Sequence, residues 1–176
     1  GGFHDVQARV LRLIGDPERR YREDPVRMLR AVRLAAKLDF DIEPATAAPI
    51  PALAHLLAEA APARLFEEIL KLFLSGHGVA GFEGLERHGL LDVLLPESAA
   101  AMKSNRSGAL RKLVVAGLKS TDERVANDEP VSPAFLFALL LWPAYCRALM
   151  GLQARALSMK HHGMRMLTCS LREENP

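Results

Sequence analysis

The sequence has few cysteines and no long uninterrupted apolar run. Its only cysteines are Cys146 and Cys169, and they are not in a Cys-x-x-Cys spacing. Neither a disulfide framework nor an ordinary zinc site is built from such a pair, which favours a reducing compartment. The longest apolar candidate, Ala134–Trp142, has the length of a core helix and is shorter than a membrane span. No basic segment followed by an apolar stretch begins the chain, so we expect a cytoplasmic protein without a signal peptide or a membrane partner.

The chain also lacks a strong overall charge. Its net charge of +2, with 49% hydrophobic and 25% charged residues, is ordinary for a globular protein of one domain or two small ones. Any binding of nucleic acid must therefore come from a local cluster. Residues 1–40 contain such a cluster, with nine Lys or Arg against six Asp or Glu.

Proline and glycine divide the rest of the chain into short helical segments. A strand is predicted at Val10–Ile14, before the turn at Gly15-Asp16-Pro17. Helices are predicted at 24–38, 44–59 with interruptions at Pro49 and Pro51, 63–75, 79–88, 90–95, 109–127 and 133–142. This pattern predicts an all-α fold, an irregular helical array with one short strand. Residues 151–176 have no clear apolar period and are expected to be weakly ordered.

Several apolar side chains are expected in the core. Met28, Leu29, Val32, Ala35 and Ala36 share one side of the helix predicted at 24–38, whereas Arg27, Arg30, Arg33 and Lys37 lie on a different, exposed side. Phe135, Phe137 and Trp142 are also expected in the core because their neighbours are apolar. The pair His161-His162 has no third ligand spaced to join it in a metal site.

The segment from Glu23 to Arg33 carries the clearest chemistry. Asp24 followed by Pro25 is a strong helix start, and Arg27 lies one turn further on the same side. A carboxylate accepts hydrogen bonds and a guanidinium donates them, so the pair complements the N6–H and N1 edge of adenine or the N4–H and N3 edge of cytosine. Guanine and uracil present the reverse pattern. The simpler alternative is a capping aspartate with a surface ion pair, beside a solvated face of Arg30, Arg33 and Lys37.

The wider sequence resembles a known family. Gly1-Gly2-x-x-Asp5, Val10-Leu11-Arg12 and Arg22-Glu23-Asp24-Pro25-x-Arg27-Met28-Leu29-Arg30-Ala31-x-Arg33 are similar to motifs of the class II nucleotidyltransferases. These are the bacterial poly(A) polymerases and the tRNA CCA-adding enzymes. Pro62-Ala63-Arg64-Leu65-Phe66-Glu67-Glu68 and Ser132-Pro133-Ala134-Phe135-Leu136-Phe137-Ala138 resemble the poly(A) polymerases more closely. The resemblance covers about residues 1–143.

The resemblance implies a place for each part of the chain. Residues 1–19 would end a catalytic head, 20–76 would form a nucleotide-selecting neck, 77–143 an RNA-binding helical body and 144–176 a divergent, weakly ordered tail. The nucleotide-binding residues implied are Glu23, Asp24, Arg27 and Arg30. Those implied for RNA are Arg33, Lys37, Arg64 and Lys71. Arg64 and the Glu67-Glu68-x-x-Lys71 stretch would also brace the nucleotide-selecting motif, through pairs across one helical turn.

The resemblance implies template-independent addition of AMP from ATP to RNA 3′ ends, for example those of mRNA, with no DNA specificity. Its metal-binding aspartates would precede the neck. Asp39-Phe40-Asp41 has the Asp-x-Asp spacing but no glycine-rich lead, so we expect no catalytic or metal-binding residue here. The chain opens at Gly1 without a methionine, which indicates a fragment. Mg²⁺ would belong to the missing head, and the chain alone is expected to be inactive.

Three alternatives stay open from the sequence. The chain could be part of a CCA-adding enzyme, because that activity uses the same donor and acceptor pattern. It could instead be a non-catalytic RNA-binding module whose arginine stripe contacts phosphates. It could also be a helical scaffold that pairs Arg27, Arg30 and Arg33 with an acidic protein.

Overall fold

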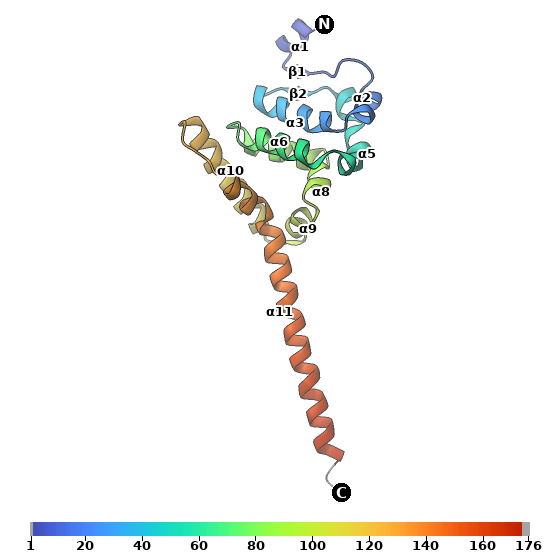
Figure 1. Cartoon of the computed structure of the whole chain (residues 1–176), viewed down its shortest axis with the longest axis vertical. Coiled ribbons are helices and arrows are strands. Elements are labelled where there is room, and N and C mark those ends of the chain that lie inside the picture. Colours follow the sequence, from blue (N-terminus) through green and yellow to red (C-terminus); the bar gives the residue numbers. More distant parts are fainter. Residues whose placement is uncertain (1, 174–176) are drawn as a thin grey trace.

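The computed structural model describes the backbone of residues 2–173 and the side chains of residues 2–153 and 155. The described chain is mostly helical, with one sheet of two short strands, which confirms the predicted all-α array with a short strand. Short helices pack into a body, and the last helix leaves this body as a long rod (Figure 1). The pair His161-His162 and Cys169 lie outside the residues whose side chains are described.

The N-terminal part is a small parallel sheet preceded by a short helix. Helix α1 spans Gly2–Gln7, β1 spans Val10–Leu11 and β2 spans Asp41–Ile42. Val10 pairs with Asp41 and Leu11 with Ile42. The predicted strand at Val10–Ile14 was therefore too long. Leu13 leaves the ladder because its backbone N–H donates to Thr46 Oγ1 at 3.1 Å. Strand β2 was missed, since two residues are too short to show alternation.

Two helices meet at Asp24. Helix α2 spans Pro17–Glu23 and begins at Asp16, whose carboxylate accepts from the Arg19 N–H at 2.7 Å. Asp24 has extended backbone, and α3 follows at Val26–Leu38. The predicted end of α3 near Leu38 is confirmed. Helix α2 was not predicted, because its seven polar and aromatic residues have no helical apolar period.

The remaining helices form the body. They are α4 Pro44–Ala47, α5 Ile50–Leu53, the 3₁₀ segment η1 Ala54–Glu59, α6 Pro62–Phe73, α7 Gly78–Arg87, α8 Leu90–Leu94, α9 Pro96–Ser104, α10 Ala109–Ala126 and α11 Pro133–Glu173. Only α9 of this set was not predicted from the sequence. It starts at Pro96, whose missing N–H is not needed at a first helical position.

The core lies between α3, α6 and α7 and continues to α8, α9, α10 and the start of α11. Met28, Leu29 and Val32 are buried as predicted, while Ala35 and Ala36 are half-buried. The core positions predicted for Phe135 and Trp142 were wrong, because both side chains are about half exposed on the outer side of α11. Phe137 is half-buried and stacks on Phe66, with ring centroids 5.3 Å apart.

Helix α11 does not stop before Pro143 as predicted. It continues to Glu173 with Pro143 inside it. Proline removes one backbone hydrogen bond, but the packing of the buried Leu136 and Leu140 beside it opposes a break. The assignment of residues 144–176 to a weakly ordered tail stays a prediction.

The segment Pro133–Gln153 of α11 is long and apolar enough to cross a membrane by length and composition alone. This is weak support for a membrane span, since core helices of soluble proteins meet the same criterion. The first part of the segment packs on α9 and α10 of the body. The uninterrupted apolar run is still shorter than a membrane span, as expected. The longer segment meets the criterion although Pro143 and Arg147 interrupt it.

Candidate functional site

The predicted nucleotide-selecting residues lie where the junction of α2 and α3 faces the first turns of α6. Helices α3 and α6 are packed side by side. The extended backbone of Asp24 turns the chain between α2 and α3 and places its carboxylate beside the start of α3. Arg64 reaches the same carboxylate from the first turn of α6.

Asp24 is held mainly by Arg64. Arg64 Nη2 donates to Asp24 Oδ1 at 3.0 Å and to Oδ2 at 2.9 Å. Burial acts to raise the pKa of Asp24, but the hydrogen bond and charge of Arg64 oppose it. The backbone N–H of Val26 and the charge of Arg27 act in the same direction as Arg64, so the pKa of Asp24 lies below its ordinary value. The carboxylate is therefore ionised at neutral pH and is available only as an acceptor.

Arg27 lies beside Asp24 but is held by other groups. Its Nε is 4.0 Å from Asp24 Oδ2. Its Nη1 donates to the backbone oxygen of Arg20 at 2.9 Å and to Glu23 Oε2 at 3.2 Å. These contacts fix the guanidinium, whose five N–H groups exceed those used. A fixed acceptor and a fixed donor thus lie next to each other.

The carboxylate of Glu23 is occupied by hydrogen bonds from three arginine side chains. It accepts from Arg19 at 3.2 Å, from Arg20 at 2.9 Å and from Arg27 at 3.2 Å. The hydrogen bond from Arg27, then the charge of Arg20, lowers the pKa of this exposed carboxyl below its usual range. Glu23 is therefore ionised and helps to orient Arg27.

A second cluster surrounds the buried carboxylate of Glu68 on α6, which is only 5% exposed. Arg30 Nε donates to Oε1 at 3.2 Å, and Arg33 Nε donates to Oε2 at 3.1 Å. Lys71 Nζ lies 3.8 Å from Oε1 and 3.5 Å from Glu67. The predicted pairs across one helical turn of α6 are therefore present. The cluster carries three cations against one buried anion.

The structure corrects the expected exposed arginine face of α3. Arg27 and Arg33 have side chains only 25% and 21% exposed, because they pair with carboxylates of α2 and α6. Arg30 is 43% exposed and Lys37 is exposed near the end of the helix. A solvated face describes Lys37 but not the other three.

The predicted site residues fall into two adjacent groups. Glu23, Asp24, Arg27 and Arg64 form the first, and Arg30, Arg33 and Lys71 surround Glu68 in the second, with Lys37 in neither. Arg64, for which the resemblance implied both an RNA contact and a bracing role, contacts the aspartate itself. The central position of Glu68 was not among the predicted site residues. Its signal was an acidic residue between Leu65 and Leu72, on the apolar side of α6.

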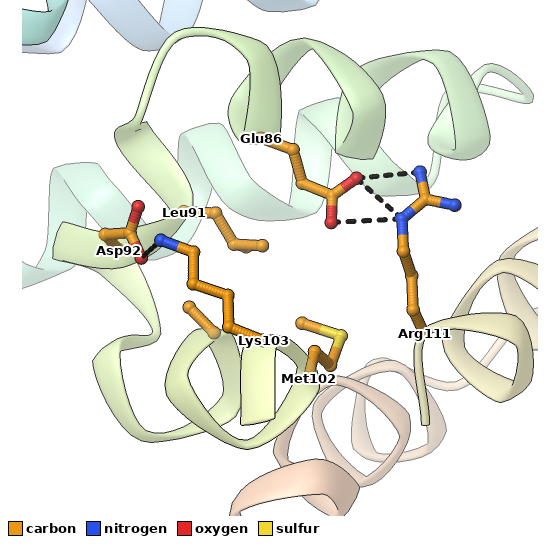
Figure 2. Close-up of a pocket in the computed structure, with 7 residues that line it drawn as sticks. Glu86, Leu91, Asp92, Met102, Lys103 and Arg111 are labelled. Carbon is orange, nitrogen blue, oxygen red and sulfur yellow. Dashed lines mark hydrogen bonds and ion pairs between the residues drawn. The ribbon is translucent and has the colours of Figure 1, made fainter. Parts of the chain in front are cut away.

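The body contains one small cavity beside two ion pairs. It has a volume of about 160 Å³, and Glu86 with Arg111 and Asp92 with Lys103 border its apolar floor of Leu91, Ala99 and Met102 (Figure 2). Arg111 donates to Glu86 at 2.8 Å, and this hydrogen bond raises the pKa of Arg111. Each cation at the cavity faces its own carboxylate, and the space is smaller than a typical ligand pocket. It is not a nucleotide site.

Across the residues with described side chains, no three or more His, Cys, Asp or Glu are grouped as a metal site. Asp39 and Asp41, which have the Asp-x-Asp spacing, have different structural roles. Asp39 ends α3 with a left-handed backbone and pairs with Arg9 at 3.1 Å, while Asp41 belongs to β2.

Comparisons with known proteins find relatives that are similar in sequence. Residues 39–102 match the model of a family described as "Probable RNA and SrmB- binding site of polymerase A". The chain is 51% identical over 142 residues to poly(A) polymerase I of Salmonella typhimurium and 50% identical over 142 residues to that of an Escherichia coli O6:H1 strain. It is 42% identical over 89 residues to a CCA-adding enzyme of Limosilactobacillus reuteri.

The extents of these matches differ. The two poly(A) polymerase matches cover 81% of the chain and 30% of each relative, and the CCA-adding match covers 51% of the chain and 22% of that enzyme. These findings confirm the resemblance to the class II nucleotidyltransferases. The similarity to poly(A) polymerases is higher and extends over more of the chain. The chain spans about 30% of the length of the poly(A) polymerases it matches.

Proposed function

We propose that this chain provides nucleotide selection and RNA binding to an enzyme that adds AMP from ATP to RNA 3′ ends without a template. The observation that carries the proposal is the Asp24–Arg27 pair. Its carboxylate and guanidinium lie side by side, 4.0 Å apart, at the start of α3. The similarity to poly(A) polymerases over 142 residues supports the reaction class.

The chemistry of selection follows from which groups each base would leave unpaired. Asp24 would accept a hydrogen bond from the N6 amino group of adenine, and Arg27 would donate one to N1. Guanine would place its carbonyl against the carboxylate and its N–H against the guanidinium. Each buried mispairing costs about 1–3 kcal/mol, so discrimination of about 10- to 100-fold per group is expected.

The neighbouring residues would keep the Asp24–Arg27 pair, which we call the base reader, in position. Arg64 engages both oxygens of Asp24 through a single nitrogen, which leaves other lone pairs of the carboxylate for a base. Glu23 holds Arg27, and Glu68 holds Arg30 beside it on α3. Arg30 is in our proposal the residue that extends the nucleotide site beyond the base.

RNA would contact the basic residues outside the base reader. We assign Arg33, Lys37, Arg64 and Lys71 to this role, of which Lys37 and Lys71 are the most exposed. The matched family model over residues 39–102, described as a probable RNA-binding site, supports an RNA surface on the body. Phosphate contacts of this kind would position RNA without reading its sequence.

The divalent metal of the reaction would be bound outside this chain. Metal ions supply charge neutralisation at the triphosphate and activate the attacking hydroxyl. In this proposal the chain's own contribution is to bind and orient ATP and RNA. We expect the chain alone to be inactive, and the cell compartment to be the cytoplasm.

The proposal is tested in a chimera that replaces the matching 142 residues of Salmonella typhimurium poly(A) polymerase I. The chimera should add A in preference to G and U to an RNA primer. Asp24→Ala and Arg27→Ala should each reduce the ratio of kcat/KM for ATP over GTP by about 10- to 100-fold. Arg22→Ala is the matched control, because Arg22 lies near Asp24 but pairs with Glu18 at 2.7 Å.

A CCA-adding activity is the second candidate, since cytosine and adenine present the same edge to Asp24 and Arg27. The shorter match to the CCA-adding enzyme favours it less. The chimera separates the two. Comparable incorporation of CTP and ATP would indicate CCA addition. Incorporation of ATP well above CTP would indicate poly(A) addition, with discrimination against cytosine supplied by groups other than Asp24 and Arg27. Unchanged nucleotide preference in both alanine variants would end the selector proposal.

A further inference from the structure

The outer side of α11 carries a continuous apolar stripe. Its members are all exposed: Ala134, Phe135, Ala138, Leu141, Trp142, Tyr145, Ala148, Leu149 and Leu152, and we call them the α11 stripe. The six large side chains among them are between 41% and 63% exposed. A contiguous apolar surface of this extent marks an interaction site.

The stripe has the spacing of a coiled coil. Ala134, Ala138, Leu141, Tyr145, Ala148 and Leu152 follow one another at intervals of four and three residues, which is the period of the core positions in a heptad. Leu136, Leu140 and Pro143 are buried on the opposite side of the helix, toward the body. Helix α11 extends away from the other helices (Figure 1), and the exposed side chains of the stripe are open to another helix.

We propose that the α11 stripe binds the α11 stripe of a second copy of this chain, with the two helices antiparallel. With a twofold axis at the height of Pro143, each heptad core residue of one copy would face a heptad core residue of the other. Ala134 would face Leu152, Ala138 would face Ala148, and Leu141 would face Tyr145 of the second copy. The outermost layer thus sets a small side chain against a large one, which allows close approach of the helices.

The exposed area is sufficient for such a dimer. An aromatic side chain has about 150–250 Å² of surface, so the half-exposed large residues of the stripe offer on the order of 600 Å² per copy. A symmetric pair would then bury about 1,200 Å², which is the lower end of stable interfaces.

Charge also favours a second copy. Arg147 is the only charged residue between Pro133 and Gln153, and it lies on the body side and pairs with Glu97 at 3.4 Å. No like charges would therefore face each other across the dimer. A helix that binds a lipid surface usually has basic residues along its polar face. Only two basic residues line the described part of the stripe on one flank, Arg155 and Arg147, and Arg147 pairs with Glu97, so a membrane is the less suitable partner.

The test is sedimentation equilibrium of the full chain across the micromolar range. The mass should rise from the 19.3 kDa of one chain toward twice that value. Leu141→Asp should weaken association by at least about tenfold, because a carboxylate would be placed in the central layer. Met150→Asp is the control: Met150 is 59% exposed on the same helix but outside the stripe, so dimerisation should persist.

Cysteine cross-linking tests the orientation. In a Cys146→Ser, Cys169→Ser background, a chain with Leu141→Cys is mixed with a chain with Tyr145→Cys and oxidised. Antiparallel pairing should give mainly the mixed dimer. Cross-links mainly between identical positions would refute the antiparallel pairing.

Three other results would overturn the proposal. One is a single-chain mass at all concentrations, with helix content unchanged by circular dichroism. Another is equal loss of association in Leu141→Asp and Met150→Asp, which would indicate unspecific apolar contact. The third is cosedimentation of the wild-type chain, but not Leu141→Asp, with phosphatidylglycerol vesicles while no dimer forms, which would assign the stripe to a membrane.

Discussion

Replacement of Glu68 by glutamine should destabilise the chain, although the side chain keeps its size. Glu68 is 5% exposed and its two oxygens accept from Arg30 and Arg33. Glutamine keeps one acceptor oxygen but turns an amide NH₂ toward one of these arginines. That arginine then loses its partner, and both lose a compensating charge.

The magnitude follows from the two hydrogen bonds. A hydrogen bond to a charged group contributes about 1.5–3 kcal/mol. The bond from Arg33, whose side chain is 21% exposed, should count almost fully, while that from Arg30 at 43% is reduced by solvent screening. We expect a loss of about 2–3 kcal/mol in the free energy of unfolding. For a chain of this size that lowers Tm by about 4–12 °C.

Urea unfolding followed by circular dichroism measures this loss, and Glu67→Gln is its control. Glu67 is 67% exposed and pairs only with Lys71, so its loss should be below about 0.5 kcal/mol. Equal, small losses in the two variants would refute the view that Glu68 joins α3 to α6.

Three further predictions follow from single contacts. Tyr21→Phe should lower the free energy of unfolding by about 1 kcal/mol in urea titrations, because the buried hydroxyl donates to the backbone oxygen of Thr46 at 3.0 Å. Burial raises the pKa of this hydroxyl to about 12. No loss in Tyr21→Phe would mean that the hydrogen bond contributes nothing to stability. Gly81→Ala should lower Tm by an amount equivalent to about 1–3 kcal/mol, because the added Cβ would lie 2.7 Å from the buried Leu72. Gly151→Ala has open space around it and should stabilise the chain slightly. The reverse order of the two variants in a thermal melt would contradict the packing. Asp24→Asn should lower the free energy of unfolding above about pH 5. This loss should disappear as the pH falls below the unfolded-state pKa near 3.8, since a lowered folded-state pKa contributes stability only while the carboxylate is ionised. A stability difference between variant and wild type that grows toward acidic pH would contradict this prediction.

Local signals predicted the proximity of Asp24 and Arg27 but not the residues that hold them. Asp24 and Arg27 are one helical turn apart, so their proximity follows from the sequence alone. The partners of Asp24 and Arg33 lie 40 and 35 residues away, on α6. No local pattern reports such contacts. For this reason Arg33 was expected to be solvated, and the bracing role implied for Arg64 came without Asp24 as its partner.

The helices were predicted correctly where apolar residues recur at a single helical period. Helices α3, α6, α7, α8 and α10 follow apolar spacing bounded by proline, glycine or polar residues, and their predicted limits hold within a few residues. Helix α11 shows the opposite case. Pro143 indicates a stop by its local chemistry, but packing of Leu136 and Leu140 on the body keeps the helix continuous.

The central claim is that Asp24 accepts a hydrogen bond from the N6 amino group of adenine. The most direct measurement compares kcat/KM of the chimera for ATP and for purine riboside triphosphate, which lacks that amino group, with and without Asp24→Ala. Wild-type residues should prefer ATP by about 10- to 100-fold, and the preference should fall to near unity in Asp24→Ala. An ATP preference that is unchanged by Asp24→Ala would contradict the claim.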